Sequence, residues 1–299
     1  MNETIYHIPV LVNEVVTYLN PKPNGLYLDV TFGGGGHTRA ILEKEPTCRV
    51  IGLDWDENAL ANGQSMIEEF EGRLRLVWGN FGQLYKIAKA QAIGNLDGIL
   101  ADFGTSHYQI ASRSGFSIFR DTPLDMRMSP AHFAQTAADL INHASFDQLC
   151  EIFWQLGEEQ HAKTIARFII QERAKKTITS TQQLADLIEK VVPSGGRKIH
   201  PATKVFQALR IYVNKELDNI QAFLPAGVRL LNNKGRLVCI SFHSLEDRLV
   251  KQFFTKYEQE NVGAIKILTD GPVQATEQEV EANSASRSAR LRAAEFYKK

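Results

Sequence analysis

The first third of this sequence alternates short apolar runs with segments of helical periodicity, and this alternation limits the folds open to the chain. Four runs rich in leucine, valine and isoleucine have the length of strands: residues 26–31, 49–54, 74–79 and 97–102. Three segments between them carry apolar side chains at helical spacing: residues 36–45, 56–70 and 82–92. Apolar strands separated by helices predict parallel βαβ units, with helices on both faces of one sheet.

The α/β pattern returns near the C-terminus. Residues 224–235 read as a helix that ends at Gly235, and residues 236–241 read as a fifth strand. Two further segments, residues 263–269 and 288–296, can pair as a closing antiparallel ribbon.

Between these parts lies a stretch without a convincing strand. It contains four amphipathic helical patterns, at residues 133–144, 146–157, 158–174 and 180–192, and Ser145 and Ser180 are expected N-caps. We therefore predict an α/β domain formed by residues 1–107 and 206–299, interrupted by an all-helical insert over residues 108–205. The stretch from Pro193 to Gly196 is the best candidate for a flexible joint.

Composition and charge set the broad class of protein. A hydrophobic content of 43% with 23% charged residues is typical of a soluble globular chain. No apolar run reaches spanning length and no signal-peptide pattern is present, so a cytoplasmic protein without membrane association is expected. Cys48, Cys150 and Cys239 lie far apart in apolar contexts, which predicts three buried thiols in a reducing compartment. A net charge of zero argues against wholesale wrapping of nucleic acid and allows a local basic face.

The four glycines Gly33 to Gly36 follow the first strand and precede a helix, so a ligand can lie against bare backbone there. A triphosphate loop needs a lysine directly after its glycines, and none occurs before Lys44. A dinucleotide fingerprint needs a third glycine, and Thr38 or Arg39 stands in that place. The alternative that the four glycines form only a tight structural turn, without a ligand, remains at this point.

S-adenosylmethionine fits the groups at the ends of the four strands better. Asp29 ends the first strand, and Asp54 ends the second, where a carboxylate can accept the ribose hydroxyls. Phe81 follows the third strand and could cover one face of the adenine, while Asp102 ends the fourth strand beside the topological switch point. The joint pattern favours the methyl donor over NAD.

Three later stretches carry a resemblance to a known family: PLDMRM at residues 123–128, HPATKVFQALRIYVNKEL at 200–217 and SFHSLEDR at 241–248. They resemble the ribosomal RNA small-subunit methyltransferase H family, also called MraW. The likeness extends to residues 7–16, 31–38 and 286–295, and so covers essentially the whole chain. It implies a Rossmann-like class I methyltransferase fold interrupted by a helical domain. It also implies methylation of N4 of a cytidine in the decoding region of bacterial 16S rRNA, with S-adenosylmethionine as methyl donor.

The resemblance also implies a set of cofactor-binding residues. They are the glycine loop with its following histidine, three residues after later strands, and one glutamine: Gly34, Gly35, Gly36, His37, Asp54, Phe81, Asp102 and Gln109. The chain departs from the family pattern at Tyr108 and Ser284, where the family has prolines, and at Ala111, where it has an aspartate. These departures concern the substrate loops more than the cofactor.

Methylation of an exocyclic amine needs close positioning and an acceptor for an amine proton, because the nitrogen lone pair is delocalised into the ring. Asp102 and Ser106 are candidate acceptors, with backbone carbonyls as an alternative, and Asp102 could equally only orient the cofactor. His243 follows the fifth strand and could contact the target base, or it could be a structural residue. No metal site is predicted.

Candidate RNA contacts lie in the insert and at its end. A segment from Pro193 to Lys215 is basic and has no carboxylate, and it supplies Arg197, Lys198, His200 and Lys204. Asp125 and Arg127 could line the substrate side or form a simple ion pair. A second basic group, which includes Lys163 and Arg167, is offset by acidic neighbours and reads more simply as a solvated face.

The expected partner is 16S rRNA, within the small ribosomal subunit or a late precursor, with the target cytidine unstacked from the folded RNA. The sequence does not define an oligomeric state, and a homodimer is compatible with it. Two other functions are alternatives: a non-catalytic RNA-binding or ribosome-associated module on the same fold, and an NAD-dependent oxidoreductase. The second lacks the third glycine of its fingerprint.

Overall fold

The computed structural model describes residues 9–104, 114–192 and 200–298. The chain divides into two compact units. We call Met1–Ser106 with Leu217–Lys299 the sheet unit, and His107–Glu216 the helical unit. The sequence placed the second junction after residue 205, whereas the compact units divide after Glu216.

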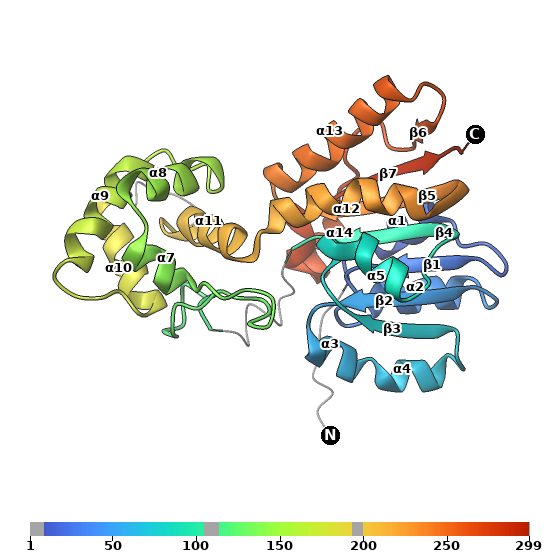
Figure 1. The fold of residues 1–299 in the computed structure, drawn as a ribbon, viewed down its shortest axis with the longest axis horizontal. Coiled ribbons are helices and arrows are strands. Elements are labelled where there is room, and N and C mark those ends of the chain that lie inside the picture. The colour runs from blue at the N-terminus through green and yellow to red at the C-terminus, as the bar shows by residue number, and fades with distance from the viewer. Residues whose placement is uncertain (1–8, 105–113, 193–199, 299) are drawn as a thin grey trace. The chain divides into compact units, whose positions relative to one another are not determined.

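The sheet unit contains one seven-stranded sheet in the order β3-β2-β1-β4-β5-β7-β6 (Figure 1). Its strands are β1 (Leu26–Asp29), β2 (Arg49–Asp54), β3 (Leu74–Trp78), β4 (Leu96–Asp102), β5 (Leu231–Ser241), β6 (Ile265–Ile267) and β7 (Arg290–Phe296). The first five strands pair in parallel, and β7 runs antiparallel to both β5 and β6. The predicted antiparallel ribbon is therefore confirmed. Because β1 lies between β2 and β4, the chain order reverses at β1, and this reversal is the switch point where open α/β sheets bind ligands.

Helices cover both faces of this sheet. They are α1 (Val12–Leu19), α2 (Gly36–Lys44), α3 (Glu57–Asn62), α4 (Gln64–Glu69), α5 (Leu84–Ala90), α12 (Glu216–Leu230), α13 (Ser244–Glu260) and α14 (Glu277–Ala282), with short 3-10 turns η1 (Phe81–Gln83) and η2 (Ser284–Ser288). Side chains alternate along each strand, so Leu28 packs in a core with α5, α12 and α13, while Tyr27 packs in a second core with α1, α2 and α4. This is the doubly wound, Rossmann-like arrangement of class I methyltransferases, and the predicted fold class is confirmed.

Two predicted boundaries are wrong. The helix expected to end at Gly235 ends at Leu230, because Leu231 already pairs with Leu96 of β4 and extends β5 toward the N-terminus. The single helical pattern over residues 56–70 is divided into α3 and α4 around Gly63. A Cβ at Gly63 would lie 2.6 Å from the Phe32 ring, so that ring takes the space a side chain would need.

The helical unit has its own hydrophobic core. Its helices are α7 (Ala137–His143), α8 (Phe146–Gln155), α9 (Ala162–Arg173), α10 (Thr181–Val191) and α11 (Thr203–Asn214). The predicted N-caps are confirmed, since the Ser145 hydroxyl accepts the Gln148 N–H and the Ser180 hydroxyl accepts the Gln183 N–H. The described residues of this unit hold no strand, only one isolated bridge between Pro123 and Ser180.

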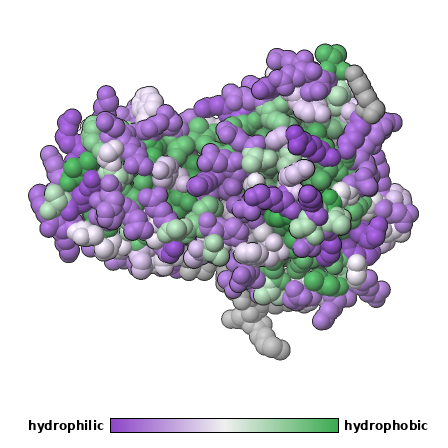
Figure 2. All heavy atoms as spheres, in the orientation of Figure 1, coloured by the Kyte–Doolittle hydropathy of each residue, from purple (hydrophilic) through white to green (hydrophobic). Residues whose placement is uncertain are grey.

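On the face drawn in Figure 2, hydrophilic residues predominate over hydrophobic ones. Within the described ranges, no helix is long and apolar enough to cross a membrane. All three cysteines are free thiols, and Cys48 and Cys239 are buried as expected. The expectation for Cys150 is wrong: it is only half-buried, because it lies at the edge of the core of the helical unit and lines a pocket there.

Candidate active site

The candidate site lies in the sheet unit, at the carboxyl ends of the parallel strands. Asp29, Asp54 and Asp102 are the last residues of β1, β2 and β4, and these three strands are adjacent in the sheet or separated by one neighbour. Parallel pairing aligns their ends, so three carboxylates meet at one edge. The sequence predicted this placement, because each of the three apolar runs ends at an aspartate.

The glycine loop brings bare backbone to this edge. Gly33 and Gly35 have φ angles of 52° and 75°, a left-handed conformation that costs other residues energy. A Cβ at Gly35 would lie 2.7 Å from Cε of Met66, and a Cβ at Gly36 would lie 2.6 Å from Cγ of Pro9. Gly34 lies exposed at the tip of the loop. The loop leads directly into α2, whose first turn presents unpaired N–H groups.

Asp54 fixes the loop to the second strand. Its Oδ2 accepts the Gly33 N–H at 2.8 Å, and its Oδ1 accepts the Asp56 N–H at 2.8 Å. Burial raises the pKa of Asp54 from 3.8 to about 6, against the lowering effect of these two hydrogen bonds. Each carboxylate oxygen has a second lone pair, so Asp54 can still accept a hydroxyl from a ligand.

Phe81 lies in a cluster of aromatic rings beside β3. Its ring centroid is 6.1 Å from that of Trp55, 5.8 Å from that of Phe103 and 5.7 Å from that of Phe223. The residue is half-buried, so part of the ring stays open to a flat ligand. Asn80 orders the turn that carries it, because its Oδ1 accepts the Gly82 N–H at 2.8 Å.

A buried polar network joins β1, α2 and β4. The Thr38 hydroxyl donates to Oδ2 of Asp29 at 2.8 Å, and the Thr31 hydroxyl accepts the Asp102 N–H at 2.7 Å. Burial raises the pKa of Asp29, and His37 and the Thr38 hydroxyl oppose that rise. The two threonines are residues that the sequence reasoning missed. Their positions, two residues after Asp29 and in the first turn of the helix after the glycine loop, were the available signal.

His37 and Asp102 lie at the centre of this network with unused hydrogen-bonding capacity. Nε2 of His37 is 3.5 Å from Oδ2 of Asp102, and the side chains are 6% and 13% exposed. The contact lacks hydrogen-bond geometry: both ring nitrogens of His37 and Oδ1 of Asp102 have no hydrogen-bond partner among the described residues. Buried polar atoms without a partner are costly, and they are satisfied when a polar ligand binds.

These observations fit the methyl donor inferred from the sequence. S-adenosylmethionine has a charged amino-acid end, a ribose and an adenine, and the edge offers a matching group for each. The glycine backbone with His37 and Asp102 suits the charged end, Asp54 suits the ribose hydroxyls, and Phe81 suits the adenine face. The residues present are therefore compatible with this cofactor.

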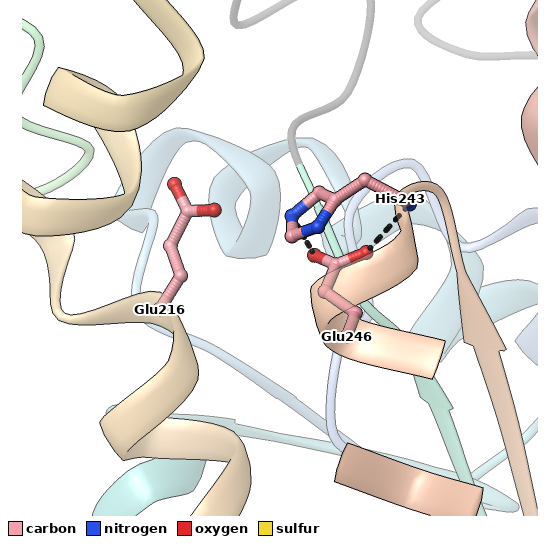
Figure 3. A group of neighbouring side chains, drawn as sticks. All are labelled: Glu216, His243 and Glu246. Carbon is pink, nitrogen blue, oxygen red and sulfur yellow. Dashed lines mark hydrogen bonds and ion pairs between the residues drawn. The ribbon is translucent and has the colours of Figure 1, made fainter. Parts of the chain in front are cut away.

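His243 directly precedes α13 at the end of β5, in the same sheet unit. Its ring Nε2 lies 3.2 Å from Oε1 of Glu246, and its backbone N–H donates to Oε2 of Glu246 at 3.3 Å (Figure 3). Glu246 is 1% exposed and also accepts the Phe242 N–H, so it is a buried cap for the start of α13. Glu246 is a further residue that the sequence reasoning missed. The available signal was a glutamate three residues after the residue that precedes the helix, which is the spacing of a capping box, here from His243 to Glu246.

The next residue of this motif is structural. Asp247 accepts two hydrogen bonds from the Arg292 guanidinium, at 2.6 and 3.1 Å. This pair connects α13 to β7. The SFHSLEDR stretch therefore serves largely to position the end of β5, and His243 is the member with unsatisfied ring nitrogens among the described residues.

Within the helical unit, Asp125 and Arg127 form a bidentate ion pair, with N–O distances of 2.7 and 2.8 Å. The ion-pair interpretation is confirmed by this geometry. Arg127 lowers the pKa of Asp125, chiefly through the side-chain hydrogen bond. Asn214, a residue that the sequence reasoning missed, holds the same loop: it accepts the Met128 N–H at 2.7 Å and donates to the Met126 carbonyl at 2.8 Å.

The basic residues expected to contact RNA are partly engaged within the helical unit. Lys204 donates to the Glu158 carbonyl at 2.8 Å, and Nε2 of His200 lies 2.8 Å from Oε1 of Glu189. Arg210 forms two hydrogen bonds of 2.9 Å with Glu216, the first residue of α12. The segment is thus less positive than its sequence suggests. Four expected site residues lie outside the described residues: Ser106, Gln109, Arg197 and Lys198.

Comparison with known proteins agrees with this geometry. The sequence model of the MraW methylase family matches residues 4–297. A ribosomal RNA small subunit methyltransferase H from Rhodopseudomonas palustris is 45% identical over 98% of this chain and 91% of its own length. The protein of that name from Carboxydothermus hydrogenoformans is 43% identical over 97% of each chain. A match of this extent shows descent and not only a shared fold, and the chain therefore belongs to the MraW methylase family.

Proposed function

We propose that this protein transfers a methyl group from S-adenosylmethionine to the N4 amine of a cytidine in the decoding region of bacterial 16S rRNA. The single observation that supports this most strongly is the set of strand-end groups around the glycine loop, in a chain that belongs to a methylase family throughout its length. The names of its relatives point to small-subunit rRNA as the substrate.

Cofactor binding is assigned to the sheet unit. The backbone of Gly34, Gly35 and Gly36 lies against the methionine part, and His37 and Asp102 complete their hydrogen bonds with its charged groups. Asp54 accepts the ribose hydroxyls as a carboxylate, and Phe81 covers the adenine. Gln109, which lies outside the described residues, is expected to join them. When bound, the cofactor supplies an electrophilic methyl group on a sulfonium.

The protein's own part in the reaction is positioning and proton acceptance. The amine must lie in line with the methyl group, because its lone pair is weakly nucleophilic. Oδ1 of Asp102 has two lone pairs and no hydrogen bond among the described residues, so beside its contact with the cofactor it can accept the proton that the amine loses as its new bond forms. Ser106 and His243 are assigned to hold the base beside it.

Substrate recognition is assigned to the helical unit, which contains the insert of residues 108–205 expected from the sequence. Arg197 and Lys198 are the preferred phosphate contacts, because Lys204 and His200 already have partners within the unit. Asp125 and Arg127 present a fixed ion pair to the substrate side. We place the enzyme in the cytoplasm, where it acts on the small subunit or a late precursor. The proposed reaction includes no metal ion, and it is compatible with a homodimer.

The test is mass-spectrometric mapping of methylated nucleosides in 16S rRNA from cells with and without the gene. The proposal requires that N4 methylation at one decoding-region cytidine disappears with the gene and returns on complementation. If the pattern of methylated nucleosides is the same in both strains, the proposed function is wrong.

A further inference from the structure

The helical unit has a pocket that no part of the proposed reaction uses. It lies between α8 and α9 and has a volume of about 530 Å³. This size falls within the range of roughly 300–1,000 Å³ found for small-molecule sites. Its lining includes an indole ring, a thiol, two amides, a cation and a carboxylate: Trp154, Cys150, Gln155, Gln160, Lys163 and Glu151.

Helix geometry explains why these side chains point outward. Leu149, Ile152 and Phe153 of α8 are buried in the core of the helical unit. Cys150, which packs at the edge of that core, and the exposed Trp154 are four residues apart, so they lie next to each other along the pocket wall.

The rim of the pocket is held in place by the turn between the two helices. Gly157 packs against α11 so closely that a Cβ would lie 2.6 Å from the Lys204 carbonyl oxygen. Glu159 is 2% exposed, its N–H donates to the Phe153 carbonyl, and its side chain accepts the His161 N–H at 2.8 Å. The pocket is therefore built on a fixed turn and two packed helices.

Trp154 is the unusual member of the lining. Its side chain is 61% exposed, one of few large apolar side chains so placed among the described residues. An indole can offer its flat face to a second ring, and stacking of bases on aromatic side chains strengthens the binding of single-stranded nucleic acids. A single exposed apolar residue needs no explanation, but one that forms the wall of a fixed pocket beside cations does.

The charges near the pocket favour an anionic partner. Lys163 and Arg167 are exposed, lie four residues apart on α9, and form no ion pair with a described residue. Both lie close enough to Cys150 to lower the pKa of its thiol, against the larger effect of burial, which raises it together with Asp147. One carboxylate, Glu151, also lines the pocket. It lies on α8, where it accepts a hydrogen bond from Gln155 at 3.1 Å, while both cations lie on α9.

We propose that this pocket binds an unpaired nucleotide of the RNA substrate, away from the methylated cytidine, with its base stacked on Trp154 and a phosphate contacted by Lys163 and Arg167. The inference rests on the proposed function, since it takes the partner to be the rRNA substrate. Single-stranded bases are recognised in this way, by an aromatic face and backbone cations together. Gln155 and Gln160 offer amide groups to the edge of the base.

The first experiment uses Cys150 as a reporter inside the pocket. Cys48 and Cys239 are buried, so Cys150 is the thiol that a maleimide can reach in the folded protein. The raised thiol pKa calls for labelling at a mildly alkaline pH. We expect small subunits lacking the modification, or a fragment of their decoding-region RNA, to slow labelling of Cys150 at concentrations that saturate binding. An unchanged labelling rate at saturation would overturn the inference.

The second experiment separates this pocket from the reacting site. Trp154→Ala is expected to raise KM for the RNA substrate by about 5- to 100-fold, with kcat and cofactor affinity unchanged. Trp154→Phe should restore most of the loss, because it keeps an aromatic face. Lys163→Ala should reduce the salt dependence of RNA binding by about one ion. Tyr85→Ala, which removes a 59% exposed aromatic side chain from α5, is the matched control.

The outcomes are distinguishable. If wild-type protein methylates 16S rRNA and Trp154→Ala has an unchanged KM, the pocket inference is wrong and the proposed function stands. If wild-type protein transfers no methyl group, the proposed function fails, and Cys150 protection by RNA still tests the pocket. Protection of Cys150 by rising protein concentration alone would show that a second copy of this chain occupies the pocket, against the inference.

Discussion

Asp54→Asn tests the cofactor site through its dependence on pH, because one carboxylate affects folding and binding in opposite directions. Burial raises its pKa from 3.8 to about 6 in the folded protein. The fold therefore disfavours the ionised form. The contribution of protonated Asp54 to the free energy of unfolding is fully present below the unfolded-state pKa of its carboxyl group. It is lost as the pH rises through about 6.

The size of the effect follows from that shift. A pKa rise of this size corresponds to about 3 kcal/mol of free energy of unfolding, which is gained in full only at low pH. Between pH 8 and pH 5 the group should add about 1 kcal/mol to the free energy of unfolding of the cofactor-free protein. Binding has the opposite sign, because the ribose hydroxyls need the ionised acceptor. Cofactor affinity should fall about tenfold between pH 8 and pH 5.

The assay pairs urea unfolding of the cofactor-free protein with calorimetric titration of S-adenosylmethionine, both at several pH values. In Asp54→Asn, the stability gain on acidification should shrink by the amount above, and the acid limb of the binding profile should disappear. Affinity at pH 8 should be about 10- to 100-fold weaker, since a charged acceptor is lost. Asp139→Asn, which removes an exposed carboxylate of α7, should leave the acid limb in place. An acid limb that persists in Asp54→Asn refutes the assignment.

Three further substitutions probe the rest of the account. Asp102→Asn should keep cofactor affinity within a few-fold and lower the single-turnover rate by about 100-fold or more, because it removes the proton acceptor; a normal rate would leave Asp102 with an orienting role only. Gly35→Ala should lower the free energy of unfolding by about 1–3 kcal/mol and abolish measurable cofactor binding in calorimetry, since its φ is 75° and a Cβ would contact Met66 at 2.7 Å. Asn214→Ala should destabilise the helical unit by about 1–3 kcal/mol in urea unfolding, because the Met128 N–H loses its acceptor; an unchanged midpoint would show that this hydrogen bond is replaced by water.

The strand ends could be predicted from the sequence because each apolar run stops at a polar residue. Asp29, Asp54 and Asp102 all end their strands, as their position after leucine- and valine-rich segments implied. Parallel pairing then dictates that such ends share an edge. This part of the site depends on local pattern and topology alone.

The boundary at Leu231 could not be predicted in the same way. Residues 231–235 contain two asparagines and a lysine, which read as the end of a helix. Their extended conformation depends on pairing with Leu96, far away in the sequence. Tertiary pairing outweighed local propensity here.

The orientation of individual side chains could also not be predicted from the sequence. Nothing in the pattern around Cys150 distinguishes its half-exposed place from the buried places of Cys48 and Cys239. The partners of Lys204 and His200 depend on how α11 packs against the turn after α8 and against α10. A basic segment in sequence is therefore not the same as a free basic surface.

The most direct test of the central claim is transfer of an isotopically labelled methyl group by the purified protein. Small subunits that lack the modification are incubated with S-adenosylmethionine carrying a trideuterated methyl group, and the rRNA is digested to nucleosides for mass spectrometry. We predict trideuterated N4-methylcytidine at a single decoding-region position, with none formed by Asp102→Asn on the same time scale. Absence of labelled nucleoside with wild-type protein, or label on another nucleoside, would contradict the account.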